Sequence, residues 1–413
     1  MLESLSACRR SHRPSGTTAI VPSRSPLISW MLLIYLLSVV WQVAHALTTV
    51  RVLVPAAFNQ DNWATQRNLT TAFAARTGIQ VEFVTMATAI TDYTATAVNT
   101  MFYSKDAFVD ILALDVVWIG DYGEYLLPLD GDAGLAAVLA QHNPQNVAAG
   151  MYGGQLKAVP QNADYGVLYS RMDLLNRYGY SAPPTTYQEM EEMMAKIVPE
   201  EKKTNPSFIG ISNQVSAYEG LTCNVLEWAY AEDAGVLLEP DRTLSSFNQQ
   251  STVGQRVVSI GKRMRKWFAN GWMSIGLTES SSGREWIRGN TLFHRNWPYM
   301  SVYTRDSGVT WPWRLTKLPA GGAALGGWLW GANKYTRNPD ATKRVLELFA
   351  SIEWQKSRAV FEGAPPTIPA LYSGVQCIAD LRGCPRAQDC SPAVVRLWSQ
   401  VSRGVQSHLY PLV

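Results

Sequence analysis

Histidine is scarce in this sequence, and the short motifs of several common enzyme classes are missing from it. Only 5 of the 413 residues are histidine. No G-x-S-x-G, H-E-x-x-H, G-x-x-x-x-G-K-[ST] or G-x-G-x-x-G segment occurs. These absences argue against serine hydrolases, zinc proteases, P-loop enzymes and dinucleotide-binding enzymes. We therefore expect no catalytic residues, although a glycoside hydrolase that uses Asp115 and Asp164 as a carboxylate pair stays open.

The chain also lacks an excess of one charge. It has 36 basic and 33 acidic residues, and residues 1–46 hold four of the basic residues but a single acidic one, Glu3. The rest of the chain therefore carries 32 residues of each sign. Binding to nucleic acid requires a concentrated basic surface, so we expect no nucleic-acid partner.

Long apolar runs are absent after residue 46, and one such run precedes it. Residues 27–41 carry no charge, Arg24 lies before them, and residues 44–46 read Ala-His-Ala. This order is typical of a cleaved signal peptide. The run is shorter than the about 20 residues of a membrane-spanning helix, yet an uncleaved signal anchor stays open. We expect residues 1–46 to direct the protein to the periplasm, the extracellular space or the cell surface.

Cysteine is rare, and it is placed unevenly. After residue 46 the chain contains Cys223, Cys377, Cys384 and Cys390. An even number in an exported chain predicts two disulfides, with three pairings open and Cys223 joined to one of the others. A zinc site is disfavoured because the spacings form no C-x-x-C pair and no histidine lies nearby. We expect no metal and no cofactor.

Aromatic residues and an alternation of strands with helices are what the sequence does contain. There are 15 tryptophans and 18 tyrosines, which can serve core packing or line a binding site. Strand patterns at 50–55, 79–85 and 109–114 alternate with helical patterns at 62–77 and 91–102. A similar alternation follows after residue 165. The pattern predicts two α/β units with parallel, helix-covered sheets.

Several segments then identify a family, taken together and in order. They are DILALDVVW (110–118), YGGQLKAVPQNADYGVLYSRMDLL (152–175), PPTTYQEM (183–190), AYEGLTCNVLEW (217–228), FHRNWPYM (293–300), LPAGGAALGGWLWGANKYTRNPDA (318–341) and PPTIPALY (365–372). The chain resembles the extracellular solute-binding proteins, family 1, of ABC sugar importers, and within them the trehalose/maltose-binding subgroup.

The resemblance implies a bilobal fold of the periplasmic-binding-protein type II class, with two α/β lobes joined by a hinge of three segments. Lobe one would comprise residues 47–160 and 317–350. Lobe two would comprise residues 161–316 and 351–413. Periplasmic binding proteins are a known example of closure around a ligand by hinge bending. The partners implied are a small sugar and the membrane permease of an ABC importer, and we expect a monomer.

Ligand-binding residues carry over by motif. The resemblance implies Asp115 and Asp164 as hydroxyl acceptors and Trp297 and Tyr299 as aromatic contacts. It also implies a close backbone approach at Gly326 and Gly327, a second ring from Trp328 and a loose match at Arg403. A family acidic contact has no counterpart near residues 58–60. The complete set is Asp115, Asp164, Trp297, Tyr299, Gly326, Gly327, Trp328 and Arg403.

Simpler roles stay open for some of these residues. Asp115 could cap a helix that begins at Val116. Trp328 and Trp330 lie on one face of a strand by alternation, so one of them could belong to the core. Tyr218 and Glu219 could line the site or cap a helix. A membrane-anchored sensor with the same two lobes is the alternative to a free carrier, and a glycoside hydrolase is the other.

Overall fold

A computed structural model describes residues 47–55, 64–86, 91–232 and 252–372, and these residues form two α/β lobes. The first lobe is built on a sheet in which β1, β2 and β3 are parallel, whereas β11 is antiparallel to both of its neighbours. In spatial order, its strands are β2 (Ile79–Thr85), β1 (Thr48–Val54), β3 (Ile111–Asp115), β11 (Leu325–Ala332) and β6 (Ala158–Tyr165).

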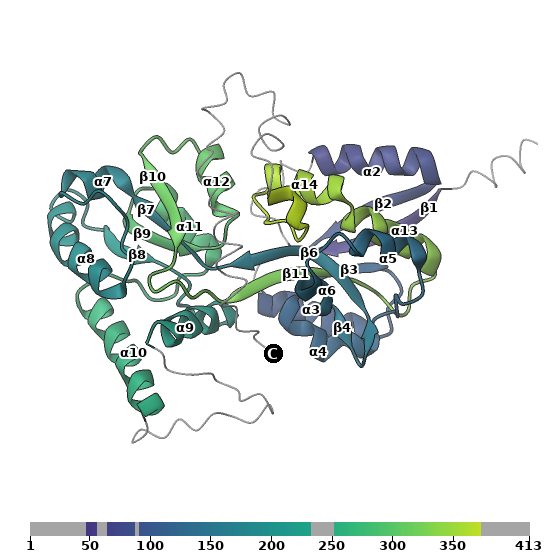
Figure 1. The fold of residues 1–413 in the computed structure, drawn as a ribbon, viewed down its shortest axis with the longest axis horizontal. Coiled ribbons are helices and arrows are strands. Elements are labelled where there is room, and N and C mark those ends of the chain that lie inside the picture. Colours follow the sequence, from purple (N-terminus) through teal and green to yellow (C-terminus); the bar gives the residue numbers. More distant parts are fainter. Residues whose placement is uncertain (1–46, 56–63, 87–90, 233–251, 373–413) are drawn as a thin grey trace, which may run out of the picture. The chain divides into compact units, whose positions relative to one another are not determined.

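Helices cover both faces of this first sheet. Successive strand residues point to opposite faces, and here both sets are apolar and need to be buried. Val52 and Ile111 belong to the core beneath α2, α5, α13 and α14, while Leu53 and Leu112 belong to the core beneath α3 and α4. The helices are α2 (Ala64–Thr77), α3 (Thr91–Tyr103), α4 (Ile119–Tyr122), α5 (Ala133–Leu139), α6 (Pro144–Ala148), α13 (Pro339–Ala350) and α14 (Ile352–Phe361). Figure 1 shows these helices around the strands.

Shorter elements complete this lobe. They are two 3-10 helices after β3, namely η2 (Val116–Trp118) and η3 (Gly123–Tyr125), a small hairpin of β4 (Met151–Tyr152) and β5 (Gln155–Leu156), and η4 (Pro369–Tyr372).

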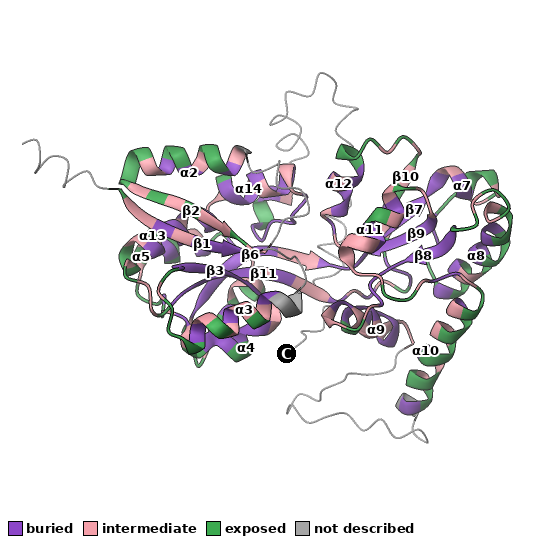
Figure 2. Ribbon diagram, turned by 180° about the vertical axis from the view of Figure 1, so that it is seen from behind, coloured by how far each residue is buried: buried purple, intermediate pink, exposed green. Residues whose placement is uncertain are grey.

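The second lobe is built on a sheet in which β7 is antiparallel to β10 and β9, while β8 and β9 are parallel. The prediction of a parallel sheet is therefore wrong for this lobe, because an alternation of strands with helices does not fix the direction of each strand. Its strands, in spatial order, are β10 (Trp313–Lys317), β7 (Val167–Arg171), β9 (Thr291–Asn296) and β8 (Ile209–Ser212). The helices around it are α7 (Met172–Arg177), α8 (Tyr187–Glu201), α9 (Glu219–Ala231), α10 (Thr252–Ala269), α11 (Glu279–Ile287) and α12 (Met300–Asp306). Figure 2 shows buried residues along the strands and exposed residues on the outer surfaces of α8 and α10.

Within the described ranges the chain passes between the two sheets at two places. Gly166 alone separates β6 of the first sheet from β7 of the second. Residues 318–324 connect β10 of the second sheet to β11 of the first. They are called the Gly166 passage and the 318–324 passage below. The 318–324 passage lies next to the expected boundary at 317. The expected boundary at 160–161 is a correction, because β6 continues through Asp164 to Tyr165 in the first sheet.

The expected boundary at 350–351 is a correction. Helix α14 follows it and contacts α2 and α13 of the first lobe. Ser351, with ψ of 155°, ends α13, and its side chain caps α14. The Trp354 ring on α14 packs against the Phe349 ring on α13, with 4.4 Å between the ring centroids. This aromatic packing holds residues 352–361 on the first sheet rather than in the second lobe.

Candidate functional site

Asp115 and Trp328 are neighbours across two strands of the first sheet. Asp115 ends β3 and lies opposite Trp328 of β11 in the antiparallel register. The Asp115 carboxylate accepts a hydrogen bond of 3.2 Å from the backbone N–H of Val117, so it does cap the short helix η2. The Trp328 ring meets Trp118 edge to face at 5.8 Å. Capping and membership in the site are therefore compatible at Asp115.

Asp164 lies on the adjoining strand, opposite Gly326. A β-bulge just before it leaves Gln161 without a partner in β11, while Asn162 pairs with Trp328. The Asn162 side-chain amide donates to Asp164 Oδ2 at 2.8 Å. Bulges of this kind redirect side chains next to functional sites, and here the bulge immediately precedes the paired Asn162 and Asp164.

The two glycines of β11 allow close approach for different reasons. A Cβ added to Gly326 would lie 3.2 Å from Cζ3 of Trp297 and 3.5 Å from Cβ of Asp164. Gly327 has φ of +129°, and a Cβ there would lie 2.6 Å from the backbone oxygen of Asn162. Glycine is thus required at 327 by the backbone, whereas at 326 it makes room for the indole of Trp297 beside Asp164.

Tyr299 lies two residues beyond Trp297, at the start of α12. It is partly exposed, and its backbone approaches Gly363, whose added Cβ would be 3.0 Å from the Tyr299 Cα. Burial, Glu279 and Asp164 raise the pKa of Tyr299 well above its ordinary value. Tyr299 of the second lobe is therefore near enough to Asp164 of the first lobe for the carboxylate charge to affect its pKa.

Burial raises the pKa values of Asp115 and Asp164, and acidic neighbours raise that of Asp115 further. Burial and the charge of Glu219 raise the pKa of Asp115 to about 8, with smaller contributions from Asp164 and Glu279. Burial raises the pKa of Asp164 to about 7, although Asn162, Arg358 and Arg295 act in the opposite direction. These causes bring Asp115, Asp164, Glu219 and Glu279 into one electrostatic group. Asp115 and Asp164 are therefore partly protonated near neutral pH in the absence of a ligand.

Glu279 and Trp118 are candidate site residues that the sequence analysis does not single out, whereas it leaves the roles of Tyr218 and Glu219 open. The Tyr218 hydroxyl donates to Glu279 Oε2 at 2.6 Å. Glu219 is the first residue of α9 and Glu279 the first of α11, so both acids begin helices. Acidic residues are common in the first turn of a helix because they interact favourably with its dipole. The positions of Glu219 and Glu279 therefore do not by themselves reveal a binding role.

Three buried polar atoms at this place have no hydrogen-bond partner among the described residues. They are Asp164 Oδ1, Asn162 Oδ1 and the hydroxyl oxygen of Tyr165. Buried polar atoms without a partner are rare and call for an explanation. Asn162 Oδ1 can only accept a hydrogen bond, and so can Asp164 Oδ1 when the carboxylate is ionised. The site can therefore accept hydrogen bonds from donors of a bound ligand.

The remaining expectations fare differently. Arg403, residues 1–46 and 58–60, and the cysteines at 377, 384 and 390 lie outside the described residues. Within the described residues, Cys223 is a free, buried thiol that donates to Glu219 Oε1 at 2.7 Å. Its expected disulfide partners lie outside those residues, so the disulfide stays a prediction. Among the described residues, no cluster of three or more His, Cys, Asp or Glu side chains could hold a metal ion. The described helices include none with the length and apolar character needed to cross a membrane.

Comparisons with known proteins identify the family and the fold. The family of bacterial extracellular solute-binding proteins matches residues 68–380. A Deinococcus radiodurans protein named a probable ABC transporter-binding protein is 36% identical over 276 residues, which cover 65% of this chain. The match spans 64% of the length of that relative.

Solved structures show the same fold at lower identity. The maltose-bound T. maritima MalE3 has a TM-score of 0.74 at 24% identity, covering 89% of each chain. A Thermotoga lettingae ABC transporter solute-binding protein bound with α-D-tagatose has a TM-score of 0.69 at 17% identity, covering 88% of this chain and 96% of its own. The bilobal α/β fold that the sequence predicted is confirmed. By its match over residues 68–380, the chain belongs to the family of bacterial extracellular solute-binding proteins.

Proposed function

We propose that this protein binds a carbohydrate, a disaccharide or short oligosaccharide, and presents it to the membrane permease of an ABC importer. One observation carries the proposal: Asp164 Oδ1 lacks a partner among the described residues, and Asp164 lies beside Gly326, which the Trp297 ring also approaches. A sugar offers hydroxyl donors around its ring and apolar C–H faces above and below. A carboxylate beside an indole matches both features.

Trp328 and Asp115 extend this arrangement on the first lobe, and Tyr299 extends it on the second. Hydrogen bonds to a charged acceptor contribute about 1.5–3 kcal/mol each, and a large aromatic ring adds apolar contact. Because the acids and the rings come from both lobes, we infer that closure of the lobes completes the contacts. The maltose and α-D-tagatose bound by the two structural neighbours support a carbohydrate as the ligand class.

We infer that the protein binds its ligand and does not catalyse a reaction. Family membership supports it, since the family is one of solute-binding proteins. Incubation with maltose or trehalose and an assay for glucose should detect no turnover. Release of glucose in proportion to the protein, lost on substitution of Asp115, would establish a glycoside hydrolase instead.

Residues 1–46 form the export segment in this proposal, placing the protein in the periplasm or outside the cell. The uncharged run at 27–41 and the Ala-His-Ala that follows support a signal peptide. N-terminal sequencing of the mature protein should find a start at Leu47. An intact segment 24–41 would instead indicate an anchored receptor.

The ligand is sought by a thermal-shift screen against a panel of sugars. A ligand that binds only the folded state stabilises it by about 2.7 kcal/mol at a hundredfold excess over its dissociation constant. Calorimetry then compares the wild type with Asp164→Ala. We expect this variant to lose affinity while it still unfolds cooperatively, whereas the exposed Asp121→Ala on α4 should bind like the wild type. Unchanged affinity in Asp164→Ala would refute the assignment of the site.

A further inference from the structure

A buried ion pair lies behind the Trp297 ring. Arg295 Nε donates to Glu227 Oε2 at 2.8 Å, and a second contact joins Arg295 Nη2 to Glu227 Oε1. Both side chains are only 2% exposed. Arg295 comes from β9 and Glu227 from α9, so the pair ties a strand to a helix within the second lobe.

The arginine of this pair touches the candidate sugar platform. The guanidinium carbon of Arg295 lies 4.2 Å from the centroid of the Trp297 ring. Nη1 of the same guanidinium donates to Gln214 Oε1 at 2.8 Å. A planar group held by three such bonds has little freedom to rotate. The face of the indole that rests on it is therefore held in a defined place.

The glutamate of the pair touches both passages between the sheets. In the 318–324 passage, the backbone N–H of Ala324 donates to Glu227 Oε1 at 3.2 Å. In the Gly166 passage, a Cβ added to Gly166 would lie 2.0 Å from Glu227 Oε1 and 2.7 Å from Arg295 Nη2. The absence of a side chain at 166 thus lets the chain lie directly against the pair.

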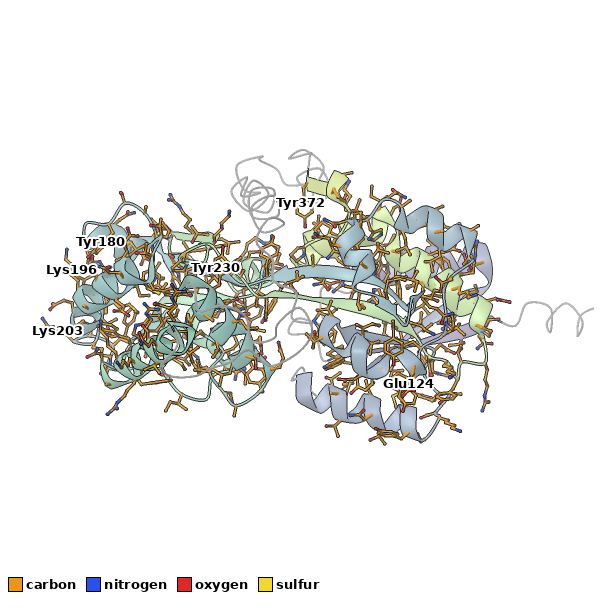
Figure 3. The ribbon with its side chains drawn as sticks, turned by 60° about the horizontal axis from the view of Figure 1, so that its bottom comes forward. Glu124, Tyr180, Lys196, Lys203, Tyr230 and Tyr372 are labelled. Atoms are coloured by element: carbon orange, nitrogen blue, oxygen red, sulfur yellow. The ribbon has the colours of Figure 1, made fainter. Side chains whose placement is uncertain are left out.

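Helix α9 adds a second contact to the same passage. A Cβ added to Gly322 would lie 1.9 Å from Cδ1 of Tyr230, which is about one helical turn beyond Glu227 and is labelled in Figure 3. The 318–324 passage therefore rests on α9 at two points, Ala324 and Gly322. A shift of this passage relative to α9 would have to disturb Glu227.

We propose that Glu227 and Arg295 form a positioning unit that couples the Trp297 ring to both passages between the sheets, so that sugar stacking and the conformation of the passages are set together. This inference rests on the proposed function. Neither residue needs to contact the sugar. A merely stabilising role is the competing explanation, and a buried ion pair is weak support for it, because replacing both partners with apolar residues is often neutral for stability.

The first test disturbs the ion pair by a substitution in the Gly166 passage. Gly166 has no positive φ, so alanine there is limited by space alone, and its methyl group must displace Glu227 or Arg295. Gly166→Ala should weaken affinity for the sugar found in the screen by about tenfold or more, which corresponds to about 1.4 kcal/mol. It should also alter the tryptophan difference spectrum that the sugar induces. The control is Gly261→Ala on the exposed surface of α10, where nothing lies within 4 Å of the added Cβ.

The Trp297 component of that spectrum is assigned with Trp297→Phe. An unchanged sugar-induced spectrum and affinity in a folded Gly166→Ala would overturn the proposal. If Gly166→Ala fails to fold, the second test decides.

The second test removes the pair while preserving its volume. The double variant Glu227→Met with Arg295→Met leaves no unpaired buried charge, so its melting temperature should stay near that of the wild type. Its affinity should nevertheless fall by about tenfold or more, and the difference spectrum of Trp297 should change. Wild-type affinity and spectrum in this variant would show that the pair is only structural and would overturn the proposal.

A single variant separates charge from shape. Glu227→Gln keeps the size of the side chain but strands the Arg295 charge, and we expect lower stability together with weaker sugar binding. Glu227→Gln with normal affinity at a temperature where it is folded would contradict the coupling. Failure of the wild type to bind any sugar in the panel would instead refute the proposed function, so the two failures are distinguishable.

Discussion

The ionised carboxylate of Asp164 destabilises the folded protein in the absence of a ligand. Its pKa is raised from the ordinary 3.8 to about 7, first because of burial. A carboxyl group that holds its proton more tightly when folded destabilises the fold as pH rises from about 4 toward the folded pKa. Functional groups that are costly to the fold are expected where a ligand completes their contacts.

Removing the charge of Asp164 should therefore stabilise the unliganded protein. Asp164→Asn keeps the shape of the side chain, and we expect it to melt about 2 °C or more above the wild type at about pH 8. Near pH 4 the difference should vanish because Asp164 is then protonated in the wild type. Calorimetric scans at both pH values check this, and a lower melting temperature of the variant at the higher pH would contradict the cause that we assign to the pKa.

Sugar affinity should depend on pH through the same groups. Hydroxyl donors favour the ionised carboxylates, so binding lowers the pKa values of Asp115 and Asp164, about 8 and about 7 in the free protein, and releases protons. Affinity should rise from about pH 6 to about pH 8. Calorimetry in buffers of different ionisation enthalpy measures the proton release. Proton uptake would mean that the carboxyl groups donate to the sugar instead.

In strand β11, sequence periodicity predicts the face on which a side chain lies but not the residue that it pairs with on the next strand. Alternation put Trp328 and Trp330 on one face and indicated that one of them could belong to the core. Trp330 does, being 1% exposed and packed on Phe349, whereas Trp328 is partly exposed. The register that puts Trp328 opposite Asp115 joins segments more than 200 residues apart, and no local pattern encodes such a pairing. Family resemblance, rather than periodicity, had named both residues.

The bulge in β6 is likewise invisible to periodicity, since it depends on tertiary contacts. The backbone oxygen of Gln161 accepts from the side chain of Gln355 on α14 at 2.9 Å. The N–H of Ala163 donates to the backbone oxygen of Pro365 at 3.0 Å. These contacts come from the segment that we expected in the second lobe. Its actual position on the first sheet supports the strand that carries Asp164.

Gly327 tests the importance of this strand geometry. Alanine there would combine a φ of +129° with a 2.6 Å approach to the Asn162 oxygen. We expect Gly327→Ala to reduce the free energy of unfolding by about 1–3 kcal/mol and to weaken sugar binding. Chemical denaturation measures the first effect and calorimetry the second. Gly120→Ala on α4, with open space around the added Cβ, is the control, and equal stability of the two variants would contradict the account.

At the scale of the whole molecule, the sequence predicted two α/β lobes from alternating strands and helices. The structure confirms both lobes but places α14, and β6 as far as Tyr165, in the first. The lobes contribute different chemistry to the candidate site: Asp115 and Asp164 come from the first, and Trp297 and Tyr299 from the second. A ligand that contacts both sets must hold the lobes together.

Addition of a binding sugar should therefore make the protein more compact. Small-angle X-ray scattering with and without the sugar should show a smaller radius of gyration in its presence, because closure brings the lobes together. Asp164→Ala, which removes a first-lobe contact, should reduce this change at the same sugar concentration. An equal radius of gyration with saturating sugar would exclude capture by closure.

A crystal structure of the protein with the sugar identified in the screen would show whether Asp164 and Trp297 hold the ligand. We expect a sugar hydroxyl within hydrogen-bonding distance of Asp164 Oδ1 and a C–H face of the sugar on the Trp297 ring. A sugar bound elsewhere, with Asp164 Oδ1 still without a partner, would contradict this expectation.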